Sequence, residues 1–139
     1  MERLTTAEAE TIRDAAKAKI LEMGAKMSVA VVDERGDLIT MVRVDGAPWR
    51  TPRICQAKAV ASAAFGRSSK DMLEMAQTPV MRGLMAMENG RMIPGQGALP
   101  VFKGDELVGA VGGSGGTAQQ DEDAARAGIQ AVAGLTTVD

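Results

Sequence analysis

Hydrophobic and polar positions follow two different periods along this chain. The first stretch has apolar residues at helical spacing after a capping-box pattern, in which Thr5 is the N-cap and Glu8 the third helical residue, and it ends at Gly24. Apolar, β-branched runs at 27–32 and 38–44 flank an acidic turn, and this arrangement predicts a hairpin. The chain is therefore expected to open with a helix and two antiparallel strands.

The middle of the chain returns to helical spacing. Thr51 is predicted to be an N-cap, with Pro52 as the first helical residue of an alanine-rich helix over 54–64. The small side chains of this helix favour close packing against the sheet or against a partner subunit. Ser68 and Thr78 then mark the starts of two further short helices.

A second hairpin is predicted after these helices. Two β-type runs, 98–102 and 107–111, flank a polar turn and follow a proline- and glycine-rich loop at 94–97. The glycine-rich segment 112–116 then leads through another capping box into a final helix that runs to about Ala133 and leaves a short polar tail. The order helix, hairpin, helices, hairpin, helix predicts an α+β fold in which helices cover one antiparallel sheet.

Composition places the chain among globular proteins and predicts one domain over 1–139. The chain has 139 residues, of which 45% are hydrophobic and 24% charged, enough for a single core. It has no run of about 18 apolar residues, and its first helix is amphipathic, so we expect neither a membrane span nor a secretory signal. Cys55 is the only cysteine, which suits a reducing compartment, and we expect a cytoplasmic protein.

Charge and missing residue types narrow the possible chemistry. Sixteen basic and eighteen acidic residues give a formal charge of −2 and form no basic stripe, so nucleic acid is not an expected partner. The chain has no His and no Tyr, which excludes His-based triads and makes a metal site unexpected. Ten methionines supply much of the large apolar volume, and we interpret them as core residues, with the lining of a pocket or of a subunit contact as the alternative.

Two glycine-rich segments are the strongest local candidates for a ligand site. Gly113, Ser114 and Gly115 lie between a strand and a capped helix, where backbone N–H groups favour a carboxylate or phosphate. Gly95 and Gly97 lie in the preceding loop, which is too rich in proline and glycine for a hydrogen-bonded ladder. The alternatives are a tight turn that needs glycine for packing and an exposed loop without function. The two segments act together only if the fold brings them to the same end of the sheet.

Charged side chains near these segments offer binding and acid–base groups. Arg43 and Asp45 close the first hairpin, and Arg53 and Lys58 flank Cys55 on the alanine-rich helix. An arginine presents a planar fork to a carboxylate, and a desolvated lysine acts as a base or a nucleophile. For each of these charges, a solvated face or a surface ion pair remains the alternative. The acidic run 121–123 complements the dipole of the last helix.

Several motifs together resemble the GlcG/HbpS family. They are Pro-Gly-Gln-Gly-Ala-Leu-Pro-Val from Pro94, Gly-Asp-Glu-Leu-Val-Gly-Ala-Val-Gly-Gly-Ser-Gly from Gly104, Val-Val-Asp-x-x-Gly-x-Leu from Val31, and Arg-x-Asp-Gly-Ala from Arg43. The resemblance covers nearly the whole chain. It implies a profilin-like arrangement of α/β/α layers, subunits that assemble into dimers or larger rings, and the binding of haem or other small ligands.

Three functions are compatible with these residues. The first is the binding of a small anionic organic ligand, with haem as a candidate, in a pocket near the glycine-rich loops. The second is a cofactor-independent enzyme acting on a small carboxylate, with Arg53 as anchor and Lys58, Asp45 or Asp121 as the acid–base group. The third is a structural oligomer without a pocket. Haem iron takes an axial ligand from a side chain, for which the chain offers Cys55 and its methionines.

Overall fold

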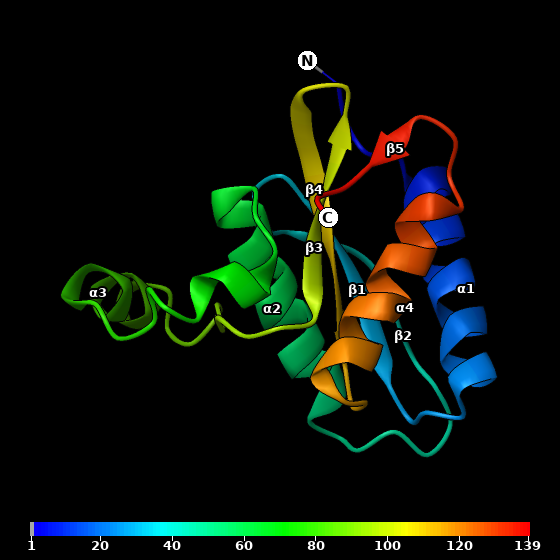
Figure 1. The fold of residues 1–139 in the computed structure, drawn as a ribbon, viewed down its shortest axis with the longest axis horizontal. Coiled ribbons are helices and arrows are strands. Elements are labelled where there is room, and N and C mark those ends of the chain that lie inside the picture. Colours follow the sequence, from blue (N-terminus) through cyan, green and yellow to red (C-terminus); the bar gives the residue numbers. More distant parts are fainter. Residues whose placement is uncertain (1) are drawn as a thin grey trace.

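A computed structural model describes residues 2–139, which form one five-stranded antiparallel sheet between helical layers (Figure 1). The strand order is β2-β1-β4-β3-β5, and every neighbouring pair is antiparallel. The predicted α+β fold is confirmed. The strands are β1 (Ser28–Asp33), β2 (Leu38–Arg43), β3 (Ala98–Lys103), β4 (Glu106–Ser114) and β5 (Leu135–Thr136).

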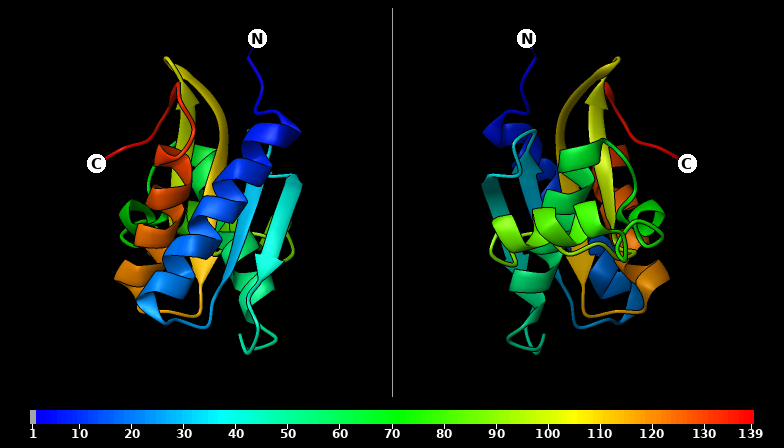
Figure 2. Two further views of the ribbon diagram at one scale, coloured as in Figure 1. Left: turned by 90° about the vertical axis from the view of Figure 1, so that its right-hand side faces the viewer. Right: turned by 90° about the vertical axis from the view of Figure 1, so that its left-hand side faces the viewer.

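The helices cover both faces of the sheet, which gives the α/β/α layers that the family resemblance implied. Helices α1 (Thr6–Met23) and α4 (Ala118–Gln130) lie side by side on one face, and α2 (Thr51–Phe65) lies on the other (Figure 2). The short 3-10 helix η1 (Ser69–Met72) and helix α3 (Pro79–Met87) follow on the α2 side. Within residues 2–139, no helix combines the length and the apolar character needed to cross a membrane.

Both predicted capping boxes are present. At α1, the Glu8 N–H donates to the Thr5 hydroxyl at 3.1 Å, and the Thr5 N–H donates to the Glu8 carboxylate at 2.9 Å. Thr117 and Gln120 repeat this exchange at α4, at 3.1 Å and 2.9 Å. Gly24 ends α1 in the left-handed conformation, with φ at 67°.

Alternate residues of the central strand β1 face the two helical layers. Val29 and Val31 belong to the main core beneath α1 and α4, whereas Val32 packs in a smaller core beneath α2. Glycine in β4 lets α2 approach closely, since a Cβ on Gly112 would collide with the carbonyl oxygen of Cys55. The alanine-rich helix therefore packs tightly against the sheet, one of the two arrangements that its small residues favoured.

Three element boundaries differ from the sequence prediction. Thr51 is the first helical residue of α2 and not its N-cap, because its hydroxyl is buried and lies 2.8 Å from both the Pro48 carbonyl oxygen and the Ser28 hydroxyl. The glycines at 112 and 113 extend β4, since they pair with β1. Helix α4 ends at Gln130, and the supposed polar tail contributes the short strand β5, which pairs with β3.

A segment that we call the α3 limb, residues 69–93, projects from the α2 side of the domain (Figure 1). A small apolar cluster that includes Met72, Met81 and Met92 joins it to α2. On the outside of the limb, Val80 and Met87 are 83% and 78% exposed. The limb holds six of the ten methionines, which are Met72, Met75, Met81, Met85, Met87 and Met92.

Candidate functional site

A buried ion pair joins two of the candidate residues that the sequence offered, Lys58 and Asp121. The ammonium of Lys58 is 3.0 Å from a carboxylate oxygen of Asp121, and the two side chains are 8% and 7% exposed. The same ammonium donates to the carbonyl oxygen of Gln96 at 3.1 Å. The other carboxylate oxygen accepts the Gly116 N–H at 2.9 Å. This pair therefore links α2, the loop 94–97, the end of β4 and α4.

The two glycine-rich segments meet next to this ion pair. The Gly113 N–H donates to the carbonyl oxygen of Gly97 at 2.9 Å. A Cβ on Gly97 would lie 2.9 Å from the carbonyl oxygen of Gly113, and a Cβ on Gly113 would lie 2.6 Å from that of Asp121. Both positions require glycine because other backbone atoms approach so closely.

The carboxylate of Asp121 accepts an N–H at the end of the glycine-rich segment for which an external anion was predicted. The N–H of Gly116 just before α4 points to this carboxylate, and the N–H of Gly113 is taken by Gly97. Burial raises the pKa of Asp121 above its ordinary value, although the charge of Lys58 and the Gly116 N–H oppose that shift. These contacts favour the packing interpretation of the glycine-rich segment over an anion site.

Cys55 lies in the core and has the properties of a structural thiol. It is fully buried, and its sulfur donates to the Pro52 carbonyl oxygen at 3.2 Å. Burial raises the pKa of this thiol to about 12, so the thiolate needed for nucleophilic attack or metal binding is scarce at neutral pH. Over residues 2–139, no three cysteine or carboxylate side chains gather in the way that a metal ion needs.

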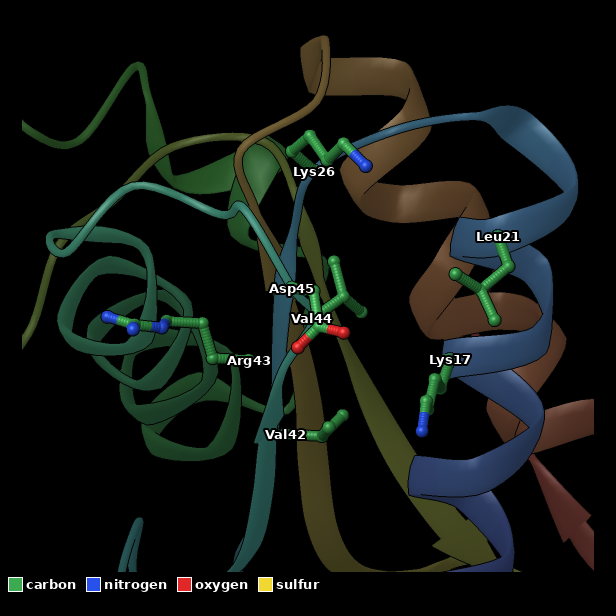
Figure 3. A pocket seen from close by; sticks show the side chains of 7 residues that line it. All are labelled: Lys17, Leu21, Lys26, Val42, Arg43, Val44 and Asp45. Carbon is green, nitrogen blue, oxygen red and sulfur yellow. The ribbon is translucent and has the colours of Figure 1, made fainter.

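A cleft of about 390 Å³ opens between α1 and the end of β2 (Figure 3). Lys17 extends from α1 and Lys26 from the segment before β1, and the Asp45 carboxylate lies between these elements. In the described part of the chain, neither lysine has a carboxylate oxygen within 4 Å. The lining residues are Lys17, Leu21, Lys26, Val42, Arg43, Val44 and Asp45.

Arg43 is among the residues that line this cleft, but its side chain points away from the two lysines. Figure 3 shows its guanidinium directed away from Lys17, toward α2. The strand register explains this direction, because Arg43 pairs with Ser28, whose hydroxyl contacts Thr51 at the start of α2. Arg53 lies in the first turn of the same helix, with its guanidinium carbon 5.4 Å from the centre of the Trp49 ring.

The predicted site residues thus separate into several places instead of forming one pocket. Sequence reasoning missed Lys17 and Lys26 because neither belongs to a motif. They can be told from other surface lysines only once the fold shows that α1 packs beside β2. The buried cluster contains Lys58, Asp121, Gly97 and Gly113, which Gly95, Ser114 and Gly115 flank in sequence. Arg43, at the end of β2, and Asp45 line the cleft, and Arg53 lies in the first turn of α2.

Known proteins similar to this chain point to one family. A model of the HbpS-like family, described as "Haem degrading protein HbpS-like", matches residues 4–130. An uncharacterized 15.0 kDa protein from the dhaT-dhaS intergenic region of Citrobacter freundii is 31% identical over 119 residues, which cover 85% of this chain and 84% of that protein.

Solved structures share the same fold. A complex of PduOC with haem superposes with a TM-score of 0.87 at 22% identity and covers 99% of this chain and 100% of that one. The Klebsiella pneumoniae protein ORFY, of the family DUF336, gives a TM-score of 0.85 at 27% identity, over 94% of this chain and 92% of that one. The sheet and its helical layers are therefore common to these proteins.

Proposed function

The chain belongs to the HbpS-like family, as its motifs indicated, and on that premise we propose that it binds a small anionic organic ligand in the cleft between α1 and β2. The observation that carries this proposal is that Lys17 and Lys26 both line the cleft and that, within residues 2–139, neither has a carboxylate oxygen within 4 Å. The two lysines outnumber the single Asp45 carboxylate, so the cleft has an excess of positive charge. The formal charge of the whole chain, in contrast, is −2.

The lining of the cleft suggests the kind of anion. The two ammonium groups suit one or two carboxylates, and the Asp45 carboxylate accepts a hydrogen bond from a hydroxyl or amine. Leu21, Val42 and Val44 provide the apolar part of the wall. A short hydroxy or amino carboxylic acid combines these features.

Haem is a candidate because the family description and one similar structure name it. Its propionate groups match the lysines, but the residues that line the cleft include none of the usual axial ligands of haem iron. The chain has no His and no Tyr, and Cys55 is buried and protonated. The cleft therefore does not fit a haem ligated by a side chain, and we infer that haem would bind there only through its propionates.

The acid–base enzyme remains the alternative, and the buried ion pair does not favour it. Lys58 and Asp121 would have to face a substrate, whereas they are hydrogen-bonded to each other and almost without solvent contact. We therefore place ligand binding first.

Titrations of the purified protein with citrate, protoporphyrin IX and haemin test this proposal. If the cleft binds carboxylates, Lys17→Met and Lys26→Met each weaken citrate binding by about tenfold, which corresponds to one lost charge-assisted contact. Lys70→Met, which removes an exposed lysine from the α3 limb, is the matched control. Equal citrate affinity in all these proteins would rule out the cleft. A haemin affinity far above that of protoporphyrin IX, lost in Cys55→Ala, would instead establish iron ligation by Cys55.

We also propose that the protein self-associates through the α3 limb. Val80 and Met87 expose most of their apolar surface there, and the family resemblance implies dimers or rings. Light scattering after gel filtration is expected to give a dimer or larger species that Val80→Lys combined with Met87→Lys converts to a monomer. A wild-type monomer at micromolar concentration would contradict this. We further propose that the protein is located in the cytoplasm, and cell fractionation tests this.

A further inference from the structure

The corner between β2 and α2 carries exposed arginines and the only tryptophan of the chain. We call residues 43–53 the aromatic corner. Trp49 is 68% exposed, and the guanidinium carbon of Arg53 lies 5.4 Å from its ring centre. Arg50 and Arg43 are exposed on the same stretch. One face of the indole therefore lies under a cation, and the rest of the ring is open to solvent.

These arginines are free to take an external anion. None of the ion pairs within residues 2–139 involves Arg43, Arg50 or Arg53. The only carboxylate in the aromatic corner is Asp45, and Figure 3 shows it on the opposite side of β2 from the Arg43 guanidinium. The aromatic corner thus carries three positive charges and one negative charge on a chain that is negative overall.

The backbone of the aromatic corner is firmly anchored. The Val44 N–H donates to the Met27 carbonyl oxygen at 3.0 Å, and the Thr51 N–H donates to that of Pro48 at 3.1 Å. The side chains of Val44 and Ala47 are buried in the main core. The Trp49 ring is therefore presented to solvent by a fixed backbone, which lowers the entropic cost of binding a ligand to it.

We propose that the aromatic corner is a second ligand site, which takes a flat aromatic carboxylate. The ligand ring stacks on the open surface of Trp49, and its carboxylate pairs with Arg50 and Arg53. An indole gives a large rigid stacking surface, and guanidinium groups pair with carboxylates in a planar, two-pronged geometry. The site shares with the cleft only a preference for anions, and it uses neither Lys17 nor Lys26.

Three probes separate stacking from charge in the test. Pyrene-1-carboxylate is flat and anionic, 1-pyrenemethanol is flat and uncharged, and cyclohexanecarboxylate is anionic without an aromatic ring. Calorimetry and the fluorescence of Trp49 follow binding, because this residue is the only tryptophan and the chain has no tyrosine. Only pyrene-1-carboxylate is expected to change the emission of Trp49, and Trp49→Leu or Arg53→Met is expected to weaken its binding in calorimetry by about tenfold.

Matched variants distinguish this site from the cleft. Trp49→Phe keeps an aromatic surface and is expected to retain most of the affinity, whereas Lys26→Met is expected to leave pyrene-1-carboxylate binding unchanged. Equal binding of 1-pyrenemethanol, or an unchanged affinity in Trp49→Leu, would overturn the inference. A Trp49 emission maximum that shifts to the red on dilution would also overturn it, because a second copy of the chain would then cover the ring. Loss of citrate binding in Lys26→Met alone bears only on the cleft.

Discussion

Replacing Lys58 with Met is expected to destabilise the fold by about 3–5 kcal/mol, because it leaves the Asp121 carboxylate buried without its cation. The methionine keeps most of the apolar stem of the lysine, so the loss of packing volume is small. The Gln96 carbonyl oxygen also loses a donor, which adds about 1 kcal/mol. Against a typical total stability of about 5–15 kcal/mol, this is a large loss.

The size of this expected loss of stability follows from the burial of the Lys58–Asp121 pair. At 3.0 Å and with the two side chains 8% and 7% exposed, solvent screens this interaction far less than a surface ion pair. A surface pair would contribute only about 0–1 kcal/mol. Asp121→Asn keeps an oxygen for the Gly116 N–H but leaves the Lys58 ammonium unpaired, and a similar loss is expected.

A double-mutant cycle measured by urea unfolding isolates the interaction. Lys58→Met combined with Asp121→Asn removes both charges, so the double variant is expected to be more stable than the sum of the two single losses predicts, by about 2 kcal/mol or more. Lys70→Met, on the exposed surface, is the control and is expected to change stability by less than about 0.5 kcal/mol. If a single variant does not fold, the double variant provides the comparison, since it is expected to fold.

The pH dependence gives an independent check of the same reasoning. In Lys58→Met the raised pKa of Asp121 loses the opposing effect of the ammonium, so it rises further. The penalty is complete above the folded-state pKa, where the carboxylate is charged, and it disappears as the pH falls and Asp121 takes up a proton. Additive losses in the cycle, or a penalty that grows toward low pH, would refute a buried charged pair.

Two substitutions and one labelling experiment test separate contacts. Lys103→Met removes the cation 2.8 Å from Glu8, whose pKa is lowered because hydrogen bonds from Lys103 and Thr5 outweigh the effect of burial. About 0.5–1 kcal/mol of stability is expected to be lost in urea unfolding near neutral pH, and less of it as the pH falls through that lowered pKa. Cys55 is expected to resist iodoacetamide at about pH 8 until the protein unfolds, as followed by mass spectrometry. Gly113→Ala is expected to cost about 1–3 kcal/mol by thermal unfolding, because the new methyl group meets the backbone of Asp121.

Each of these three predictions has an outcome that would contradict it. If Lys103→Met lowers the free energy of unfolding by the same amount throughout the acid range, the charge of Glu8 does not contribute to stability. Alkylation of Cys55 at the rate of a free thiol would show that α2 opens readily. Gly83→Ala is the control for the glycine change, since a Cβ there has no neighbour within 4 Å, and it is expected to stabilise α3 by about 0.5–1 kcal/mol. Equal effects at both glycines would remove the packing argument.

Local signals were sufficient to predict most of the elements. The capping boxes that begin with Thr5 and Thr117 involve residues three positions apart, so the sequence contains the whole interaction. Thr51 was assigned wrongly because its hydroxyl bonds to Ser28, which is distant along the chain. The extension of β4 and the existence of β5 likewise depend on strands that lie elsewhere in the sequence.

The candidate site was harder to predict, since it depends on tertiary contacts. Lys58 and Asp121 lie on helices that cover opposite faces of the sheet, and nothing in the spacing of the two residues indicates their contact. A glycine-rich segment before a helix has the same sequence pattern whether its N–H groups donate to an external anion or to a carboxylate of the chain itself. Lys17 and Lys26 became candidates only when the cleft between α1 and β2 was known.

The strand order has a consequence for how this protein is made. Strand β4 lies between β1 and β3, so the register that pairs Ser28 with Ser114 joins strands that are far apart in the sequence. During synthesis, β1 and β2 emerge after α1 and well before β4, and a two-stranded hairpin is only marginally stable by itself. The free edge of β1 remains unpaired until β4 leaves the ribosome, and such edges promote aggregation. The centre of the sheet is completed late, and a nascent chain that stops before residue 106 is expected to aggregate more readily than the complete chain.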